Sequence, residues 1–149
     1  MPTSIYLAGK IRQVSDRGRS YREHVKQRYP QFSYLDPCRR NFNGDLDYSP
    51  TLSNEARAIV QADLLDIATC DILLADCRSG PSFGTAAEIF AAKQLNKTVI
   101  VIITPDWFND IWLKYCFDYL ATSIEEAFKF LGSLPKKRRL RNEKKYLET

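Results

Sequence analysis

The stretch Ala75–Glu88 combines residue types that could bind an anion and carry out acid chemistry. It follows a short apolar run, Ile72–Ala75, passes through turn-forming residues at positions 79–81 and ends in an alanine-rich helical pattern. In a strand–loop–helix unit, ligands collect beyond the carboxyl end of the strand, and the free N–H groups at the helix start suit an anion, above all a phosphate. Ser82 and Gly84 lie where such a ligand would be met.

Glu88 is the lone acid of this stretch. In the expected helix, roughly residues 83–96, it shares a face with four small residues at the spacing i, i+3, i+4, namely Gly84, Thr85, Ala91 and Ala92. A solvent-exposed side chain is the ordinary interpretation of a helical glutamate. The small residues leave room for a ligand to approach the acid, so the pattern favours a functional Glu88.

Asp63 is a second acid in an unusual position. A helix is predicted from an N-cap at Ser53 to about Thr69, and Asp63 falls on its apolar stripe. The stripe consists of Ala56, Ile59, Val60, Leu64 and Ile67. A carboxylate on a core-facing stripe costs free energy unless it is paired or used. A functional role and pairing with a helix end or an arginine both remain open for Asp63.

The elements that position these residues alternate along the chain. Strands are expected at residues 4–8, 32–35, 71–76, 97–103 and about 115–120, and helices at about 15–28, 53–69, 83–96 and 122–131. This alternation predicts an α/β fold, a single doubly wound, flavodoxin-like sheet of five parallel strands in the order 2-1-3-4-5 with helices on both faces. At its switch point the loop after strand 1 faces the turn after strand 3. The predicted site gathers Gly9, Arg12, Asp63, Ser82, Gly84 and Glu88.

Length and charge divide the chain into one domain and a tail. The 149 residues are enough for a single α/β domain, expected at residues 1–134, followed by a basic C-terminal tail at 135–149. Residues 136–149 contain seven Lys/Arg and two Glu, so the tail has a net charge of +5. Because the whole chain has a net charge of +4, the rest of the chain has −1. Because the tail lacks the interleaved aromatic residues of a single-strand binder, a solvated terminus is favoured over contact with nucleic acid.

Several classes of protein do not fit the composition. No apolar run approaches the roughly 20 residues that cross a bilayer, and the N-terminus has no signal-peptide pattern, so we expect a soluble, cytoplasmic protein without a membrane partner. The four cysteines show no C-x-x-C spacing, and His24 is the only histidine. We therefore expect no zinc site, no disulfide framework and no cofactor, with reduced and mostly buried thiols.

The order of several motifs resembles the nucleoside 2-deoxyribosyltransferase superfamily over most of residues 4–103. The matching pieces are Ile5-Tyr-Leu-Ala-Gly9, Asp63, Asp71, Gly84-x-x-x-Glu88 and Ala91-x-x-x-Leu-Asn-Lys97. The resemblance implies that Glu88 is the nucleophile that attacks the anomeric carbon of a sugar. It also implies that Asp63 assists departure and return of the nucleobase. A dimer or higher homo-oligomer with shared sites is implied as well, and Trp107–Tyr115 is a candidate contact.

Two motifs are closer to the 2'-deoxynucleoside 5'-monophosphate N-hydrolase branch. They are Tyr6-x-x-Gly9-x-Ile11-Arg12 and Pro81-Ser82-x-Gly84-x-x-x-Glu88. The serine of that branch binds the 5'-phosphate, whereas transferases that act on unphosphorylated nucleosides tend to have an acid there, which would repel a phosphate. Lys10 departs from the branch, which usually has a small hydroxyl residue, although a lysine can also serve a phosphate. Tyr6, Gly9, Lys10, Arg12, Ser82 and Gly84 are the predicted substrate-binding residues.

The resulting prediction is an enzyme that cleaves the N-glycosidic bond of a (2'-deoxy)nucleoside 5'-monophosphate through a glycosyl-enzyme intermediate on Glu88, and releases the base to water. In this scheme Glu88 is ionised, and burial raises the pKa of Asp63 so that it protonates the base. The alternatives are base exchange on unphosphorylated deoxynucleosides, a non-catalytic nucleotide-sensing module, and a protein recruited to nucleic acid by its tail. The base and the sugar preference stay open.

Overall fold

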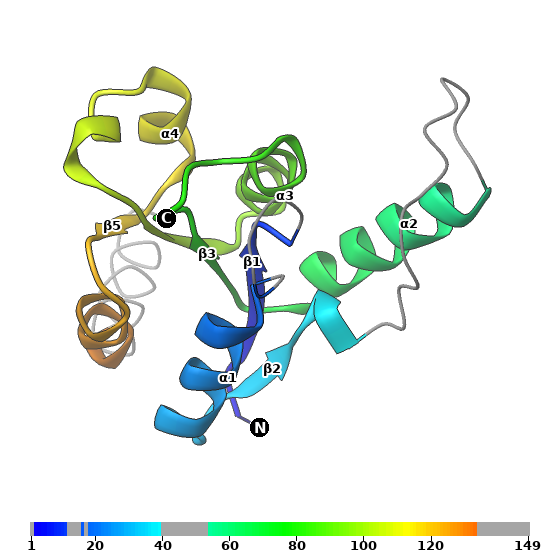
Figure 1. Ribbon diagram of the computed structural model, residues 1–149, viewed down its shortest axis with the longest axis horizontal. Helices are drawn as coiled ribbons and strands as arrows, with labels where there is room; N and C mark the ends of the chain where they lie inside the picture. Colours follow the sequence, from blue (N-terminus) through cyan, green and yellow to red (C-terminus); the bar gives the residue numbers. More distant parts are fainter. Residues whose placement is uncertain (1, 12–15, 17, 40–53, 134–149) are drawn as a thin grey trace, which may run out of the picture.

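The computed structural model describes residues 2–11, 16, 18–39 and 54–133, and within them it contains one parallel sheet of five strands (Figure 1). The strand order is β2-β1-β3-β4-β5, which confirms the predicted flavodoxin-like topology. The strands are β1 Ser4–Gly9, β2 Ser33–Leu35, β3 Ile72–Asp76, β4 Thr98–Ile102 and β5 Tyr119–Ala121. The predicted tail at 135–149 lies outside the described residues, so the domain boundary stays a prediction.

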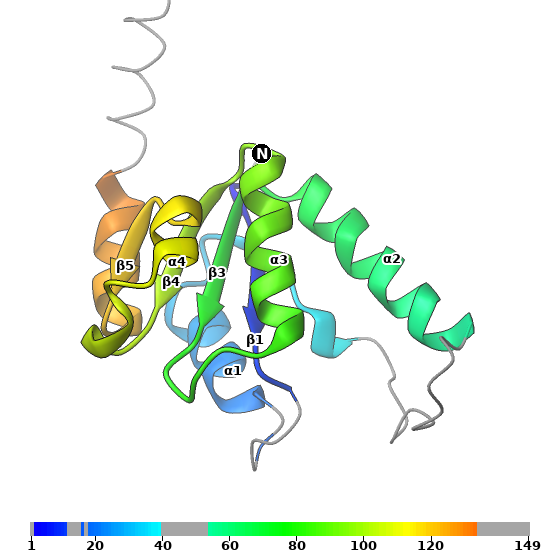
Figure 2. The ribbon, with the colours of Figure 1, turned by 90° about the horizontal axis from the view of Figure 1, so that it is seen from above.

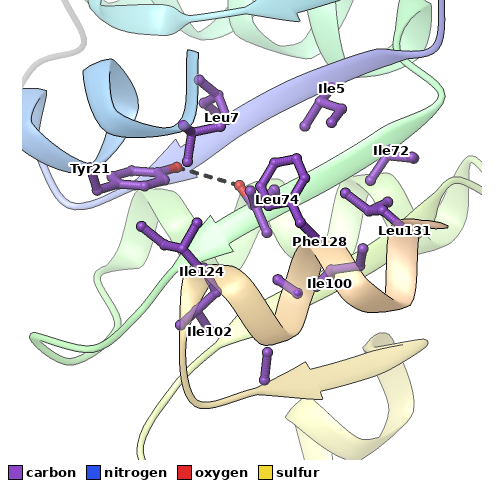
Figure 3. Close-up of a cluster of buried hydrophobic side chains, with 13 residues drawn as sticks. Ile5, Leu7, Tyr21, Ile72, Leu74, Ile100, Ile102, Ile124, Phe128 and Leu131 are labelled. Carbon is purple, nitrogen blue, oxygen red and sulfur yellow. Dashed lines mark hydrogen bonds between the residues drawn. The ribbon is translucent and has the colours of Figure 1, made fainter. Parts of the chain in front are cut away.

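The central strands are buried because their side chains are apolar on both faces. Apolar residues of β1, β3 and β4 alternate between two clusters, one on each side of the sheet. One cluster is covered by α1 (Arg19–Arg28) and by helical residues 124–133 (Figure 3). The other is covered by α3 (Phe83–Gln94), the short α4 (Ile111–Cys116) and the end of α2 (Asn54–Thr69), through Ile67.

Two local differences from the predicted elements have clear causes. The first helix begins at Arg19 rather than near residue 15, because Gly18 adopts a left-handed conformation (φ 75°) and Asp16 accepts hydrogen bonds from the backbone of Gly18 and Ser20. The last strand, Tyr119–Ala121, begins later than the predicted residue 115, because α4 runs to Cys116. Asp110 caps α4 by accepting a hydrogen bond from Leu113 N at 2.8 Å.

The last helix begins at residue 124 rather than near 122, because Ser123 is its cap. Ser123 Oγ accepts from Glu126 N at 3.1 Å, and the Glu126 carboxylate accepts from Thr122 N at 3.0 Å. Short 3-10 turns occupy Pro37–Arg39 and Pro105–Trp107. The predicted cap at Ser53 lies outside the described residues.

Candidate active site

Glu88 lies in the second turn of α3, beside the carboxyl ends of β1 and β3. Its Oε2 accepts a hydrogen bond from the hydroxyl of Tyr6, whose side chain is completely buried on β1. Tyr6 therefore holds the carboxylate from the sheet side. This contact brings together residues 82 positions apart in the chain and builds the first part of the site.

The charge of Glu88 is set by opposing neighbours. The net effect raises its pKa from 4.5 to about 7; burial is the main cause, and the negative charge of Asp63 acts in the same direction. The hydrogen bond from Tyr6 and the positive charge of Arg22 act in the opposite direction. The raised pKa belongs to the expected nucleophile, although the sequence predicted one for Asp63.

Asp63 lies half-buried on α2 and is close enough to influence Glu88 electrostatically. The expectation that its stripe faces the core is wrong, because Val60 is 53% exposed and Leu64 is 44% exposed, while Ile67 is buried. The cause is the position of α2, which contacts α3 and projects away from the sheet (Figures 1 and 2). The two candidate acids thus come from adjacent helices.

Ser82 and Gly84 form the start of α3. Ser82 is the N-cap, and its Oγ accepts from Thr85 N at 3.2 Å and lies 3.0 Å from Thr85 Oγ1. Gly84 is exposed one turn before Glu88, and a Cβ added there would meet no atom within 4 Å. The backbone above the carboxylate is therefore open to a ligand.

The loop after β1 reaches the turn after β3, as the topology predicted. Lys10 Nζ donates to Ser79 O at 3.4 Å. Gly9 ends β1 with φ 152°, where an added Cβ would lie 3.2 Å from Asp76 O. Arg12, the other cation predicted for a phosphate, lies outside the described residues.

A family model described as nucleoside 2-deoxyribosyltransferase matches residues 5–113. The chain belongs to this family. It is therefore an enzyme of the deoxyribosyltransferase and nucleoside N-glycosidase kind, as its motifs predicted.

Solved structures of this nucleoside 2-deoxyribosyltransferase fold are similar to the chain. The 2-deoxyribosyltransferase of Bacillus psychrosaccharolyticus is 24% identical, with a TM-score of 0.58, 78% of this chain covered and 85% of that one. The Leishmania mexicana enzyme is 21% identical, with a TM-score of 0.61 and 87% and 96% covered. The Clostridium botulinum CMP N-glycosidase BcmB is 12% identical, with a TM-score of 0.54 and 87% and 99% covered. No curated protein sequence matches the chain.

A hollow of about 680 Å³ lies on the α1 side of the deoxyribosyltransferase fold, away from the two acids. Lys10, the start of α1, the β3–α3 turn and the first turn of residues 124–133 line it, whereas Glu88 and Asp63 do not. Its walls contain both acidic and basic side chains, and Arg78 Nε forms an ion pair with Asp76 Oδ1 at 2.9 Å. We place the candidate site at Glu88 and Asp63 rather than in this hollow, because two carboxyl groups suit the chemistry of the family.

The described part of the chain shows neither a metal-binding cluster nor a membrane-spanning helix. No group of three or more His, Cys, Asp or Glu side chains there is arranged to hold a metal ion, and no helix there is long and apolar enough to cross a membrane. All four cysteines are free, and Cys70, Cys77 and Cys116 are buried. The buried thiols agree with the prediction from cysteine spacing.

Arg22 is a residue of this region that the motifs did not reveal. Its side chain is 1% exposed and contacts backbone carbonyls at the end of β1. The sequence carries only a weak signal for it, because Arg22 shares a helix face with the apolar Val25 on an otherwise polar helix.

Proposed function

We propose that this enzyme cleaves the N-glycosidic bond of a 2'-deoxynucleoside 5'-monophosphate and releases the base to water. The observation that carries the proposal is the Glu88 carboxylate, held by Tyr6 below the open backbone of Gly84. The N-terminus of the same helix is capped by a serine rather than an acid. The proposed nucleophile, Glu88, and the start of α3, which suits an anion, thus lie within two turns of the same helix.

The reaction takes place in two steps. An oxygen of ionised Glu88 forms a bond to the anomeric carbon while the N-glycosidic bond breaks, and the electron pair leaves with the base. Asp63, in its protonated form, gives its proton to the departing base. Water then attacks the same carbon, the ester bond breaks to restore the Glu88 carboxylate, and the proton from water returns to Asp63.

The phosphate is assigned to the start of α3. Ser82 Oγ and the free N–H groups of the first turn favour a negative group, and Lys10 lies across the β3–α3 turn. Arg12 would add a bidentate cation from the β1–α1 loop. An acid at position 82 would instead repel a phosphate, so the serine supports a phosphorylated substrate.

The proposal is tested by incubating the enzyme with a panel of deoxynucleosides and their 5'-monophosphates and following free base by chromatography. Glu88→Gln keeps an acceptor for Tyr6 but removes the nucleophile, so it should abolish base release. Glu23→Gln, an exposed position on α1, is the matched control and should leave the rate unchanged. Absence of base release from every compound, or release that Glu88→Gln does not diminish, contradicts the proposal.

Ser82→Asp tests recognition of the phosphate separately from recognition of the rest of the substrate. Aspartate is as good an N-cap as serine, so α3 should keep its stability. Its charge should reduce kcat/KM for monophosphates by tenfold or more, of the order of one lost charge-assisted hydrogen bond, and affect nucleosides little. Equal losses for both substrate classes would argue against the phosphate assignment.

Base exchange is the second candidate function, and it is favoured by the family model and by the two deoxyribosyltransferases of similar fold. Here a second base, rather than water, attacks the glycosyl-enzyme intermediate. Adding a different free base to each reaction distinguishes the two. Formation of a new nucleoside or nucleotide supports transfer, whereas free base and sugar alone support hydrolysis.

A further inference from the structure

Arg22 fills a gap in the hydrogen-bonding pattern of the sheet. β1 pairs with β3 as far as Gly9, but its pairing with β2 ends at Tyr6. The carbonyls of Leu7 and Gly9 point in the same direction, because alternate residues of a strand do so. No β2 residue is registered opposite them, so these two acceptors need another donor.

The guanidinium group of Arg22 supplies that donor. Its Nε and one terminal nitrogen donate to Leu7 O at 3.3 and 3.1 Å, and the same terminal nitrogen donates to Gly9 O at 3.2 Å. The other terminal nitrogen donates to Gly18 O at 2.9 Å. Arg22 therefore holds both ends of the segment that runs from Gly9 to Gly18, which contains Lys10 and Arg12.

The cation is fixed from the β2 side as well. Asp36 follows β2, is buried, and lies 3.5 Å from Arg22 Nε through its Oδ1. Lys26 binds the other oxygen of Asp36, and Cys38 N donates to Oδ1 at 2.8 Å. This network balances the buried charge and joins the ends of two loops.

Gly18 leaves the space that the guanidinium occupies. A Cβ there would lie 2.2 Å from an Arg22 terminal nitrogen and 2.6 Å from Lys10 O, and Gly18 also has a left-handed φ of 75°. The position of the Arg22 guanidinium therefore requires glycine at position 18.

We propose that Arg22 is a positioning residue of this enzyme, which fastens Gly18, before α1, to Gly9, at the carboxyl end of β1, and so fixes Lys10, which lies across the β3–α3 turn from the proposed phosphate site. The phosphate in this inference comes from the proposed function, on which this part of the inference rests. Arginine suits the role because it directs three nitrogens at three carbonyls, whereas lysine carries its three donors on a single nitrogen.

Arg22→Lys tests the geometry while retaining the positive charge. We expect faster amide hydrogen exchange in peptides covering residues 9–20, and a KM for monophosphates that is about tenfold higher with kcat within about twofold of wild type, as for a lost fixed binding geometry. Arg28→Lys, an exposed position on the same helix, is the control and should change neither quantity. Unchanged exchange in Arg22→Lys would overturn the proposal, even if the protein releases no base.

Arg22→Gln removes the charge as well as the geometry. Tyr6, Asp63 and Arg22 all influence the pKa of Glu88, and Arg22 is the one cation among these three. Arg22→Gln should therefore move the acid limb of kcat/KM to higher pH, whereas Arg22→Lys should leave it in place. Should Arg22→Gln fail to fold, Gly18→Ala provides the second variant, and it should reproduce the exchange and KM changes of Arg22→Lys. Normal exchange and KM in Gly18→Ala would contradict the clamp.

Discussion

Glu88 is held in a balance that affects how it reacts. Burial and Asp63 favour its protonated form, and Tyr6 and Arg22 favour the carboxylate, with a resulting pKa of about 7. A carboxylate that is poorly solvated is more reactive toward a developing oxocarbenium ion than one in water. Because of the same burial, Glu88 is protonated in a fraction of the enzyme molecules at neutral pH.

The pH dependence of kcat/KM should reveal this balance. Because only ionised Glu88 attacks the sugar, the acid limb of kcat/KM should rise with pH through about 7, and kcat/KM should fall at higher pH, where Asp63 loses the proton that it gives to the base. Tyr6→Phe removes a hydrogen bond that stabilises the carboxylate, so its limb should lie at higher pH. The shift distinguishes Glu88 from the substrate phosphate, which titrates near 6. A limb that Tyr6→Phe leaves in place would assign the titration to another group.

Glu88 should also make folding stability depend on pH. Its folded pKa is raised above the unfolded value of 4.5, so its contribution to stability is present below 4.5 and is lost as the pH rises through about 7. Glu88→Gln removes this loss, so its advantage in free energy of unfolding over wild type should grow by about 2–3 kcal/mol between pH 5 and pH 8. Urea unfolding at the two pH values measures the difference, and Glu23→Gln should show none. An equal difference at both pH values would contradict the buried-carboxyl interpretation.

Spacing was sufficient to single out the two candidate acids but not the buried arginine near them. Glu88 and Asp63 stand out because an acid is unusual among small or apolar neighbours. Arg22 does not stand out, because an arginine on an otherwise polar helix is normally exposed. Its burial depends on where β2 stops pairing with β1, which no local pattern encodes.

At the scale of the elements, α3 provides most of the candidate site, from its cap at Ser82 to the carboxylate of Glu88. Its alanine-rich pattern made its position predictable. The strands were predictable for a similar reason, since β3 and β4 are apolar runs between turn residues. α4 was not, because its aromatic residues are typical of strands and a single cap at Asp110 decides its conformation.

Gly84→Ala should separate the stability of α3 from its function. An added Cβ meets no atom within 4 Å, so alanine should stabilise the helix by up to about 1 kcal/mol. If the substrate approaches this backbone, the same methyl group should lower kcat/KM. Gly132→Ala is the matched control, because its Cβ also meets no atom and it lies in helical residues 124–133. Thermal unfolding and base release measure the two effects, and unchanged activity in Gly84→Ala would place the substrate elsewhere.

The whole molecule exposes an apolar area that a single chain leaves uncovered. We call it the α3–α4 surface, and it comprises Phe90, Trp107, Ile111, Trp112 and Tyr115. Ile111 is 76% exposed and Trp112 is 68% exposed, and the Trp112 ring packs edge-on against Phe90 at 6.3 Å. Large exposed apolar areas of this kind are typical of protein interfaces, so we propose that a second copy of the chain covers it.

Trp112→Glu should weaken this association. Placing a charge in an interface that excludes water is costly, so the variant should be a monomer at concentrations where wild type is a dimer. Analytical ultracentrifugation measures the state, and Lys129→Glu, exposed on the opposite face, is the control. A wild-type monomer, or a dimer that Trp112→Glu leaves intact, would contradict the assignment.

The α3–α4 surface also gives the protein a built-in optical signal. Trp107 and Trp112 are the two tryptophans of the chain, and both belong to this surface rather than to α2 or α3, which carry the acids. Intrinsic fluorescence should therefore shift to shorter wavelength as protein concentration rises and two chains meet. Self-association of the unlabelled enzyme could thus be followed by emission alone, independently of any chromatographic assay for the released base.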